Sequence, residues 1–339
     1  MGMAANGSNE PSSVVAVGAS AGGVEALTKL AGSLPHHLQS SVLVVLHMPA
    51  GAPSVLARIL DRSGPLTAVA AVHGAQLRSG QVYVAVPDQH LLVQDSRVVL
   101  SDGPTENGHR PAINALFRSV ALAHGPRAVG VVLSGVLDDG VLGSAAIRSR
   151  GGTTIAQRPT DALFPAMPQN AIDAGVVDHL ASAAEVGGLL AKLAQREFEE
   201  PTMERDAKLE FENRIAMGRR FSTRLDTEAL GPPSGYVCPD CHGSLQEVNQ
   251  GNYRCRVGHA WTGEALLRAR DEEVENALWV AVRSLQEKSK LARRMADSLG
   301  AGQLYDRYSA LADEAEHAMA VLGERICDAY GRAGERGAG

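Results

Sequence analysis

The chain has 339 residues, of which 45% are hydrophobic, a length and composition that predict two or three domains with enough apolar material for a buried core. Its formal net charge is −6, so it lacks the basic surplus that favours binding to nucleic acid or to anionic lipid. No apolar run approaches the ~20 residues of a membrane span, and the polar N-terminal stretch lacks the apolar core of a signal peptide, so a cytoplasmic protein without membrane insertion is expected.

The first predicted strand, Val14–Val17, runs into a glycine-rich turn, Gly-Ala-Ser-Ala-Gly-Gly, and then into a helix predicted over Val24–Ser33. The Gly-x-Ser20-x-Gly spacing is that of a nucleophile elbow, which exposes a serine hydroxyl at the top of a sheet. The turn also nearly fits a dinucleotide fingerprint, but that motif needs an acidic residue at the end of the next strand. The next predicted strand is followed by His47 instead, which favours an esterase over a dehydrogenase.

Up to about residue 190, short aliphatic runs alternate with helical patterns, which predicts an α/β fold with a doubly wound, mostly parallel sheet. The region Tyr83–Leu100 carries the turn signals of antiparallel hairpins and is expected to form an inserted edge. Further strands are predicted at Val42–Leu46, Ala68–Ala71, Gln81–Ala85, Leu91–Val93, Arg97–Leu100, Val129–Leu133 and Thr153–Ala156, and further helices at Pro53–Asp61, Ala112–His124, Gly140–Ser149 and Ala166–Ala174.

Three predicted strand ends carry side chains that are typical of a serine hydrolase. Because parallel strands end at the same edge of a sheet, Ser20, His47 and the carboxylates Asp138 and Asp139 are expected on one rim. There His47 can accept the proton of Ser20 while an aspartate orients the histidine. Each residue also has an ordinary alternative: Ser20, Asp138 or Asp139 can cap a helix, and His47 can bond to backbone. Their coincidence at three strand ends favours a catalytic triad.

These motifs together resemble the catalytic domain of CheB, the bacterial chemoreceptor methylesterase. The resemblance covers roughly residues 13–190 and is carried by Val-Gly-Ala-Ser20-Ala-Gly-Gly, Val-Leu-His47-Met-Pro, Gly-His109-Arg110-Pro111 and Leu-Ser-Gly-Val-Leu-Asp138-Asp139-Gly140. It implies that Ser20 is the nucleophile, His47 the general base and Asp139 the residue that orients His47. The implied reaction is hydrolysis of glutamyl methyl esters on cytoplasmic chemoreceptor helices, with release of methanol and with deamidation of particular glutamines. The alternatives are a non-catalytic signalling adaptor and an esterase that acts on another protein or small ester.

The substrate-facing groups depart in part from the family's pattern. The amides of Ala21 and Val136 are the predicted oxyanion donors, since one follows the nucleophile at a helix start and the other lies in a glycine turn. The family usually has threonine in place of Ala21, and a Gly-Met-Gly turn where Val136 stands. Arg110 either clamps an acidic receptor side chain or forms a structural salt bridge. About a dozen residues precede the first strand, so no receiver domain is expected there, and control would come from a separate response regulator.

The composition changes near residue 190, since residues 1–190 hold 11 Lys/Arg and 13 Asp/Glu, whereas residues 191–339 hold 21 and 25. We therefore predict a catalytic domain over 13–190 and a charged helical linker over 191–234, which ends at the breaker cluster Gly231–Gly235. A small zinc-knuckle module over 235–265 and an α-helical hairpin over 266–332 follow.

The zinc-knuckle module is predicted from the spacing of three of the four cysteines. Cys238-x-x-Cys241 and, after 13 residues, Cys255-x-x-x-His259 suit a tetrahedral Cys3His zinc site rather than a disulfide framework. With four ligands the zinc would be structural, and no cofactor is expected for catalysis. His242 is a rival ligand that is awkwardly placed beside Cys241. Nucleic-acid binding is the alternative use of such a ribbon, which the acidic surroundings disfavour.

The helical hairpin is predicted from two apolar stripes on either side of Gly300–Gly302. One stripe runs from Val274 to Leu299 and the other from Leu304 to Leu322, both in steps of four and three residues. Two such stripes can bury each other as an antiparallel pair. Docking to a receptor bundle, or holding a dimer, is the alternative use of these helices.

Overall fold

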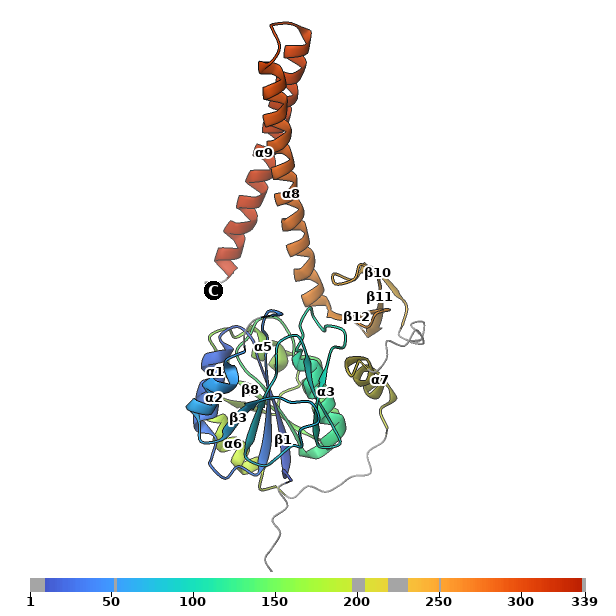
Figure 1. The fold of residues 1–339 in the computed structure, drawn as a ribbon. Coiled ribbons are helices and arrows are strands. Elements are labelled where there is room, and N and C mark those ends of the chain that lie inside the picture. The colour runs from blue at the N-terminus through green and yellow to red at the C-terminus, as the bar shows by residue number, and fades with distance from the viewer. Residues whose placement is uncertain (1–9, 52–53, 197–204, 219–230, 250, 337–339) are drawn as a thin grey trace, which may run out of the picture. The chain divides into compact units, whose positions relative to one another are not determined.

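Seven parallel strands form the central sheet of the computed structural model, in the order β3-β4-β2-β1-β7-β8-β9 (Figure 1). β1 (Ser13–Ala19) lies in the middle, between β2 (Ser40–Leu46) and β7 (Ala128–Val132). The outer strands are β3 (Thr67–Ala70), β4 (Gln81–Val84), β8 (Thr153–Gln157) and β9 (His179–Ala181). The strand order reverses beside β1, and a reversal of this kind leaves a crevice at the carboxyl ends of the strands. The structure describes residues 10–51, 54–196, 205–218, 231–249 and 251–336.

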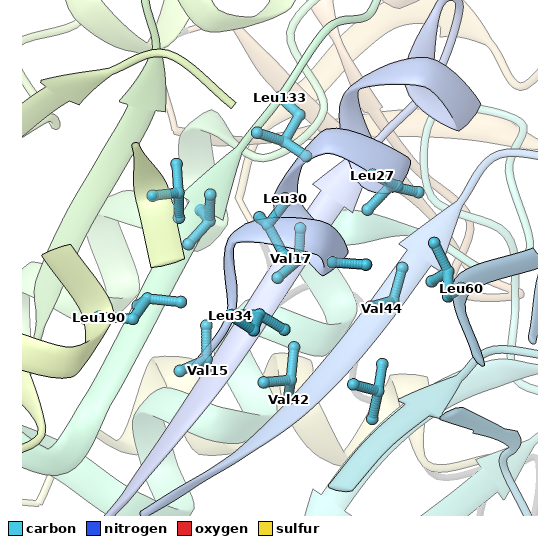
Figure 2. Packing of buried hydrophobic residues seen from close by; sticks show 14 of the residues in the cluster. Val15, Val17, Leu27, Leu30, Leu34, Val42, Val44, Leu60, Leu133 and Leu190 are labelled. Carbon is cyan, nitrogen blue, oxygen red and sulfur yellow. The ribbon is translucent and has the colours of Figure 1, made fainter. Parts of the chain in front are cut away.

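Helices cover both faces of this sheet because the side chains of β1 alternate between two apolar clusters. Val15 and Val17 join one cluster (Figure 2), and Val14 and Ala16 join the other. The first cluster contains residues of α1 (Gly23–Ser33), α2 (Leu56–Ser63) and α6 (Val186–Leu193); the second contains residues of α3 (Ile113–His124), α4 (Val141–Ser149) and α5 (Ala166–Asp173). The predicted doubly wound α/β fold is confirmed.

The predicted antiparallel hairpin is present, but it forms its own two-stranded sheet rather than an edge of the main one. β5 (His90–Gln94) pairs only with β6 (Arg97–Ser101) among the described strands. Tyr83 lies in β4 of the main sheet, outside the hairpin. The apolar side chains Leu91 and Val98 join the core around α3, and this burial, rather than edge pairing, fixes the hairpin.

Two elements near residue 190 were not predicted. β9 has only three residues, too few to show a period, and α6 contains Gly187 and Gly188, which lower its helical signal. In the predicted linker, α7 (Ala207–Ala216) is helical, while residues 197–204 and 219–230 lie outside the described residues. Pro53, the predicted start of α2, also lies outside them.

A four-stranded antiparallel sheet follows, which we call the ribbon (residues 233–262). Its strands are β10 (Pro233–Val237), β11 (Ser244–Asn249), β12 (Asn252–Cys255) and β13 (Ala260–Thr262). The chain divides into two units, Met1–Leu266 and Leu267–Gly339, so the ribbon belongs to the same unit as the large sheet.

In the second unit α8 (Gly263–Asp297) and α9 (Gln303–Arg336) run antiparallel, side by side near their connecting turn and apart toward their other ends (Figure 1). Val274 and Met295 of the first predicted stripe are 59% and 38% exposed, and Leu304 of the second is 54% exposed, so these members are not buried between the helices. Ala296 and Ser289 are buried instead, and the Ser289 hydroxyl donates to Glu316 of α9.

No helix among the described residues has an apolar stretch long enough to cross a membrane.

Candidate active site

Ser20 lies in a tight turn between β1 and α1. The Gly23 amide donates to the Ser20 carbonyl at 2.8 Å, and Gly22 has a φ of +69°. A Cβ on Gly22 would lie 2.7 Å from Ser134 Oγ, so the turn needs glycine both for its conformation and for space. The Ser20 amide donates to the Ser134 carbonyl at 2.9 Å. These bonds hold Ser20 at the carboxyl edge of the sheet, as a nucleophile elbow requires.

His47 and Asp139 lie in hydrogen-bonded series with Ser20. The His47 amide donates to the Ala19 carbonyl at 3.1 Å, and this bond holds the His47 backbone next to Ser20. His47 Nδ1 lies 3.2 Å from Ser20 Oγ, and His47 Nε2 lies 2.7 Å from Asp139 Oδ2. An ionised carboxylate only accepts, so Nε2 carries the ring hydrogen and Nδ1 is left to accept from the serine. The structure thus brings together the three residues that the sequence places at separate strand ends.

Asp139 is 2% exposed and is held at the N-terminus of α3. Its Oδ2 accepts from the Ile113 amide at 2.8 Å and its Oδ1 from the Asn114 amide at 3.0 Å. The first amides of a helix have no partner within the helix, so an anion there is stabilised. Burial by itself raises the pKa of Asp139, but bonds from His47 and the Ile113 amide outweigh burial and hold this pKa below its usual range. Asp139 is therefore ionised at neutral pH.

Two further residues make this arrangement possible. A Cβ on Gly18 of β1 would lie 2.3 Å from the Ile113 side chain, so only glycine lets α3 approach so closely. Asn114 Oδ1 accepts from the amides of Gly140 at 3.0 Å and Gly143 at 2.7 Å, at the start of α4. Asp139, just before α4, therefore caps α3, and Asn114, in the first turn of α3, caps α4. Sequence reasoning did not assign Asn114 a role; an asparagine at a predicted helix start was its only signal.

A cavity of about 350 Å³ opens beside His47. It is lined by His47, Met48, Pro49, Ala50, Asp88, Thr105, Gly108, His109 and Arg110. The His109 ring stacks on that of His47, with ring centroids 3.8 Å apart and planes 15° apart. Sequence reasoning noted His109 only as part of a motif and did not predict the stack, which restricts the plane of the His47 ring.

Arg110 is largely engaged by the protein itself. Its Nε and Nη2 donate to Asp88 Oδ1 at 3.0 and 2.6 Å, and its Nη1 donates to the carbonyls of Asp102 and Gly103. A guanidinium has five N–H groups, and these bonds use four of them. Arg110 therefore forms the structural salt bridge, and its role as a substrate clamp stays a prediction.

The two predicted oxyanion donors lie close to Ser20, Ala21 along the chain and Val136 in space. Ala21 follows Ser20 directly, and its carbonyl accepts from the Ser134 hydroxyl at 2.8 Å. Val136 follows Gly135, on which a Cβ would lie 3.0 Å from Ser20 Cβ. Their assignment to an oxyanion stays a prediction.

The four predicted zinc ligands converge in the ribbon. Cys238, Cys241, Cys255 and His259 each bring one ligand atom to within 4.8 Å of the others. Cys241 Sγ lies 3.6 Å from Cys255 Sγ, and His259 Nδ1 lies 3.4 Å from Cys255 Sγ. Tetrahedral zinc with bonds of about 2.3 Å to sulfur separates two thiolates by about 3.8 Å, so the four atoms fit this metal. His242 is not part of the group.

The part of the chain that forms the large sheet is similar to known proteins. Residues 15–190 match the protein family described as CheB methylesterase. A protein-glutamate methylesterase/protein-glutamine glutaminase of Methanosarcina mazei is 35% identical over 190 residues, which cover 54% of this chain and 52% of that protein. One of Anaeromyxobacter dehalogenans is 40% identical over 185 residues, which cover 54% of each. The chain thus spans about half the length of the curated relatives it matches.

A solved structure shows the same fold. The CheB methylesterase catalytic domain of Thermotoga maritima superposes with a TM-score of 0.52 at 30% identity. The superposition covers 53% of this chain and 98% of that domain.

The triad predicts a large effect of Asp139→Asn. Loss of the carboxylate removes the group that fixes the hydrogen on His47 Nε2, and the same change in another Ser-His-Asp triad lowers kcat by about 10⁴-fold. We expect the rate of covalent labelling of Ser20 by a fluorophosphonate to fall by a factor of similar order. Asp95→Asn, in the exposed turn between β5 and β6, is the control. Labelling of Asp139→Asn at the wild-type rate would contradict the assignment.

Asp138 predicts a pH-dependent change in stability. Burial raises its pKa to about 6, against the bond that the Thr262 hydroxyl donates. Ionisation of Asp138 therefore destabilises the folded state relative to the unfolded state. This destabilisation is absent below about pH 4, the pKa of an aspartate in the unfolded chain, grows as the pH rises, and is complete above about pH 6, the pKa in the folded state. Asp138→Asn retains an acceptor for Thr262, so its gain in unfolding free energy should grow from near zero at pH 4 to about 3 kcal/mol at pH 7.5. Urea unfolding of both proteins across this range measures it; a gain that does not vary with pH would refute the prediction.

Proposed function

The chain belongs to the CheB methylesterase family, and we propose that it is a serine hydrolase that demethylates glutamyl methyl esters of chemoreceptors. The observation that carries this proposal is the series of hydrogen bonds from Ser20 through His47 to Asp139, with Asp139 buried and bonded to two helix amides. A non-catalytic adaptor has no need of these bonds.

The proposed reaction proceeds through an acyl-enzyme. His47 Nδ1 accepts the Ser20 proton as Oγ attacks the ester carbonyl, while the amides of Ala21 and Val136 stabilise the tetrahedral oxyanion. His47 then returns the proton to the departing methoxide, and methanol leaves a glutamyl ester on Ser20. Water attacks this ester with His47 again as base, which releases glutamate and restores the serine. With a glutamine substrate, ammonia leaves in place of methanol.

The surroundings of the nucleophile support a protein substrate over a small ester. Leu163 and Phe164 are 64% and 41% exposed, and a Cβ on Gly22 would lie 2.9 Å from Leu163 Cβ and 3.1 Å from Phe164 Cδ2. Leu163 and Phe164 therefore place exposed apolar side chains beside Gly22, which follows Ser20 by two positions in the chain. Such a surface suits contact with the apolar side of an amphipathic helix. The methylated cytoplasmic helices of chemoreceptors are therefore the proposed partner. The names of the relatives, which give glutamate in a protein as the site of action, agree with a protein substrate.

Methanol release from methylated chemoreceptor membranes tests the proposal. We expect wild-type protein to release methanol and Ser20→Ala to release none, because alanine lacks the hydroxyl that forms the proposed acyl-enzyme. Ser79→Ala should match the wild type, because Ser79 is a half-buried serine just before the start of β4, at the opposite end of the strand from the carboxyl edge. Wild-type protein that is labelled by fluorophosphonate but releases no methanol would indicate another ester. Absence of both labelling and release would indicate an adaptor.

We also propose that Cys238, Cys241, Cys255 and His259 hold a structural zinc ion. The buried apolar side chains of the ribbon are few, including Leu245 and Trp261, so this module needs a further source of folding energy. Zinc would supply it by joining the Cys238–Cys241 knuckle to β12 and the turn after it. No step of the hydrolysis runs through the ion.

Metal analysis of the intact chain tests the zinc site. We expect one zinc per chain in native mass spectra, and its loss in Cys241→Ser, since three ligands bind zinc far more weakly than four. His242→Asn is a matched control, because asparagine tolerates the left-handed backbone at this position, where φ is +57°. Loss of zinc from His242→Asn, with zinc retained by Cys241→Ser, would reverse the ligand assignment.

A further inference from the structure

The ribbon lies against a loop that forms one wall of the cavity beside His47. We call this segment the His109 loop (residues 104–110). The Asn107 amide donates to the Ala260 carbonyl at 2.8 Å, and the Ala260 amide donates to the Thr105 carbonyl at 3.2 Å. The Thr262 amide donates to Asn107 Oδ1 at 2.9 Å. β13 thus pairs with the loop much as one strand pairs with another.

Side chains extend this contact along the loop. The Thr105 hydroxyl donates to Asp240 Oδ2 at 2.6 Å, and Asp240 lies between the metal ligands Cys238 and Cys241. A Cβ on Gly108 would lie 3.3 Å from the ring of Trp261, which is buried. The loop is therefore bound to both the knuckle and the last strand of the ribbon.

A buried ion-pair network links the same surfaces. Glu106 of the loop accepts two bonds from Arg118 of α3, and Arg254 of β12 lies 4.0 Å from Glu106. Burial by itself raises the pKa of Glu106, but the two arginines outweigh burial and hold it below its usual range. Removing one partner from a buried charge network is strongly destabilising. The ribbon is thus a fixed part of this unit rather than a loosely tethered module.

Thr262 connects the ribbon to the segment that carries the triad's aspartate. Its hydroxyl donates to Asp138 Oδ1 at 2.9 Å, and it accepts from the Ala265 amide at 3.2 Å. Asp138 directly precedes Asp139. One ribbon residue therefore contacts the His109 loop through its amide and the Asp138–Asp139 segment through its hydroxyl.

We propose that the ribbon, folded on its metal, positions the His109 loop and Asp138, and through them the His47 ring and the substrate cavity, with Thr262 as a positioning residue. The proposal rests on the proposed esterase function. Thr105, Gly108, His109 and Arg110 of the loop all line the cavity, and His109 stacks on His47. Because the loop's backbone partners include β13, its conformation depends on the ribbon. Metal binding and the geometry of the catalytic site are then coupled.

Amide hydrogen exchange of the full chain tests the coupling directly. Thr262→Val removes the hydroxyl, which bonds Asp138 and accepts from the Ala265 amide, so we expect the Ala265 amide to exchange about tenfold faster, the effect of losing one typical hydrogen bond. The Asn107 amide, which β13 holds through the Ala260 carbonyl, should exchange faster as well, because Thr262 also bonds Asn107 through its own amide. Fluorophosphonate labelling of Ser20 should slow several-fold in the same variant, and Thr262→Ser should restore both rates. Thr67→Val, an exposed threonine of β3 at the opposite end of the strands, is the control and should change neither.

A second variant separates this effect from loss of the bond that the Thr262 hydroxyl accepts from the Ala265 amide in the first turn of α8. Asp240→Ala breaks the Thr105 bond and leaves Thr262 intact, and it should also speed exchange in residues 105–109 while zinc stays bound. Zinc removal from the wild type by a chelator should expose the same amides, while those of β1 stay protected. Wild-type exchange and labelling in both variants would overturn the proposal. Absence of methanol release from receptors would contradict only the proposed function, because exchange reports on the loop without any substrate.

Discussion

The site depends on one buried carboxylate placed at the start of a helix. Asp139 is almost inaccessible to water, and a charge in such a place is stable only if its oxygens are fully bonded. The N-terminus of α3 supplies two amides and His47 supplies a third donor. This cap favours the ionised aspartate, which is the partner that sets the tautomer of His47.

Several features of the fold follow from that requirement. Gly18 has no side chain, which lets α3 approach β1 closely enough for its amides to reach Asp139. Asn114 completes the arrangement because its side-chain oxygen accepts from two amides at the start of α4, while its backbone amide donates to Asp139. Ser20, His47 and Asp139 are thus held at one edge of the sheet by three features together. These are the turn at Ser20, the capped start of α3 and the order of the parallel strands.

The two C-terminal parts of the chain use different physical means to stay folded. The ribbon has few buried apolar residues, brings three cysteines and a histidine together and bonds to the loop at residues 104–110 within the same unit. In the helical unit, small side chains such as Ala292 and Ala315 are buried, and Arg293 pairs with Asp313 and Glu316 of the facing helix. Long helices with a narrow contact expose most of their surface, which accounts for the rise in charged residues after position 190.

The sequence by itself determined the elements and residues whose signals are local. Buried parallel strands appear as short β-branched runs, the elbow as closely spaced glycines, and the metal group as Cys-x-x-Cys with Cys-x-x-x-His. Ser20, His47 and Asp139 could be placed on one rim because parallel strands necessarily end at the same edge. Only the tertiary structure decided the stack of His109 on His47, the cap provided by Asn114, the separate β5–β6 sheet and the pairing of the ribbon with the His109 loop. Thr262 and Asp138 are 124 positions apart, and no periodicity or spacing records a contact between segments so distant, because it depends on how whole surfaces fit once the chain has folded.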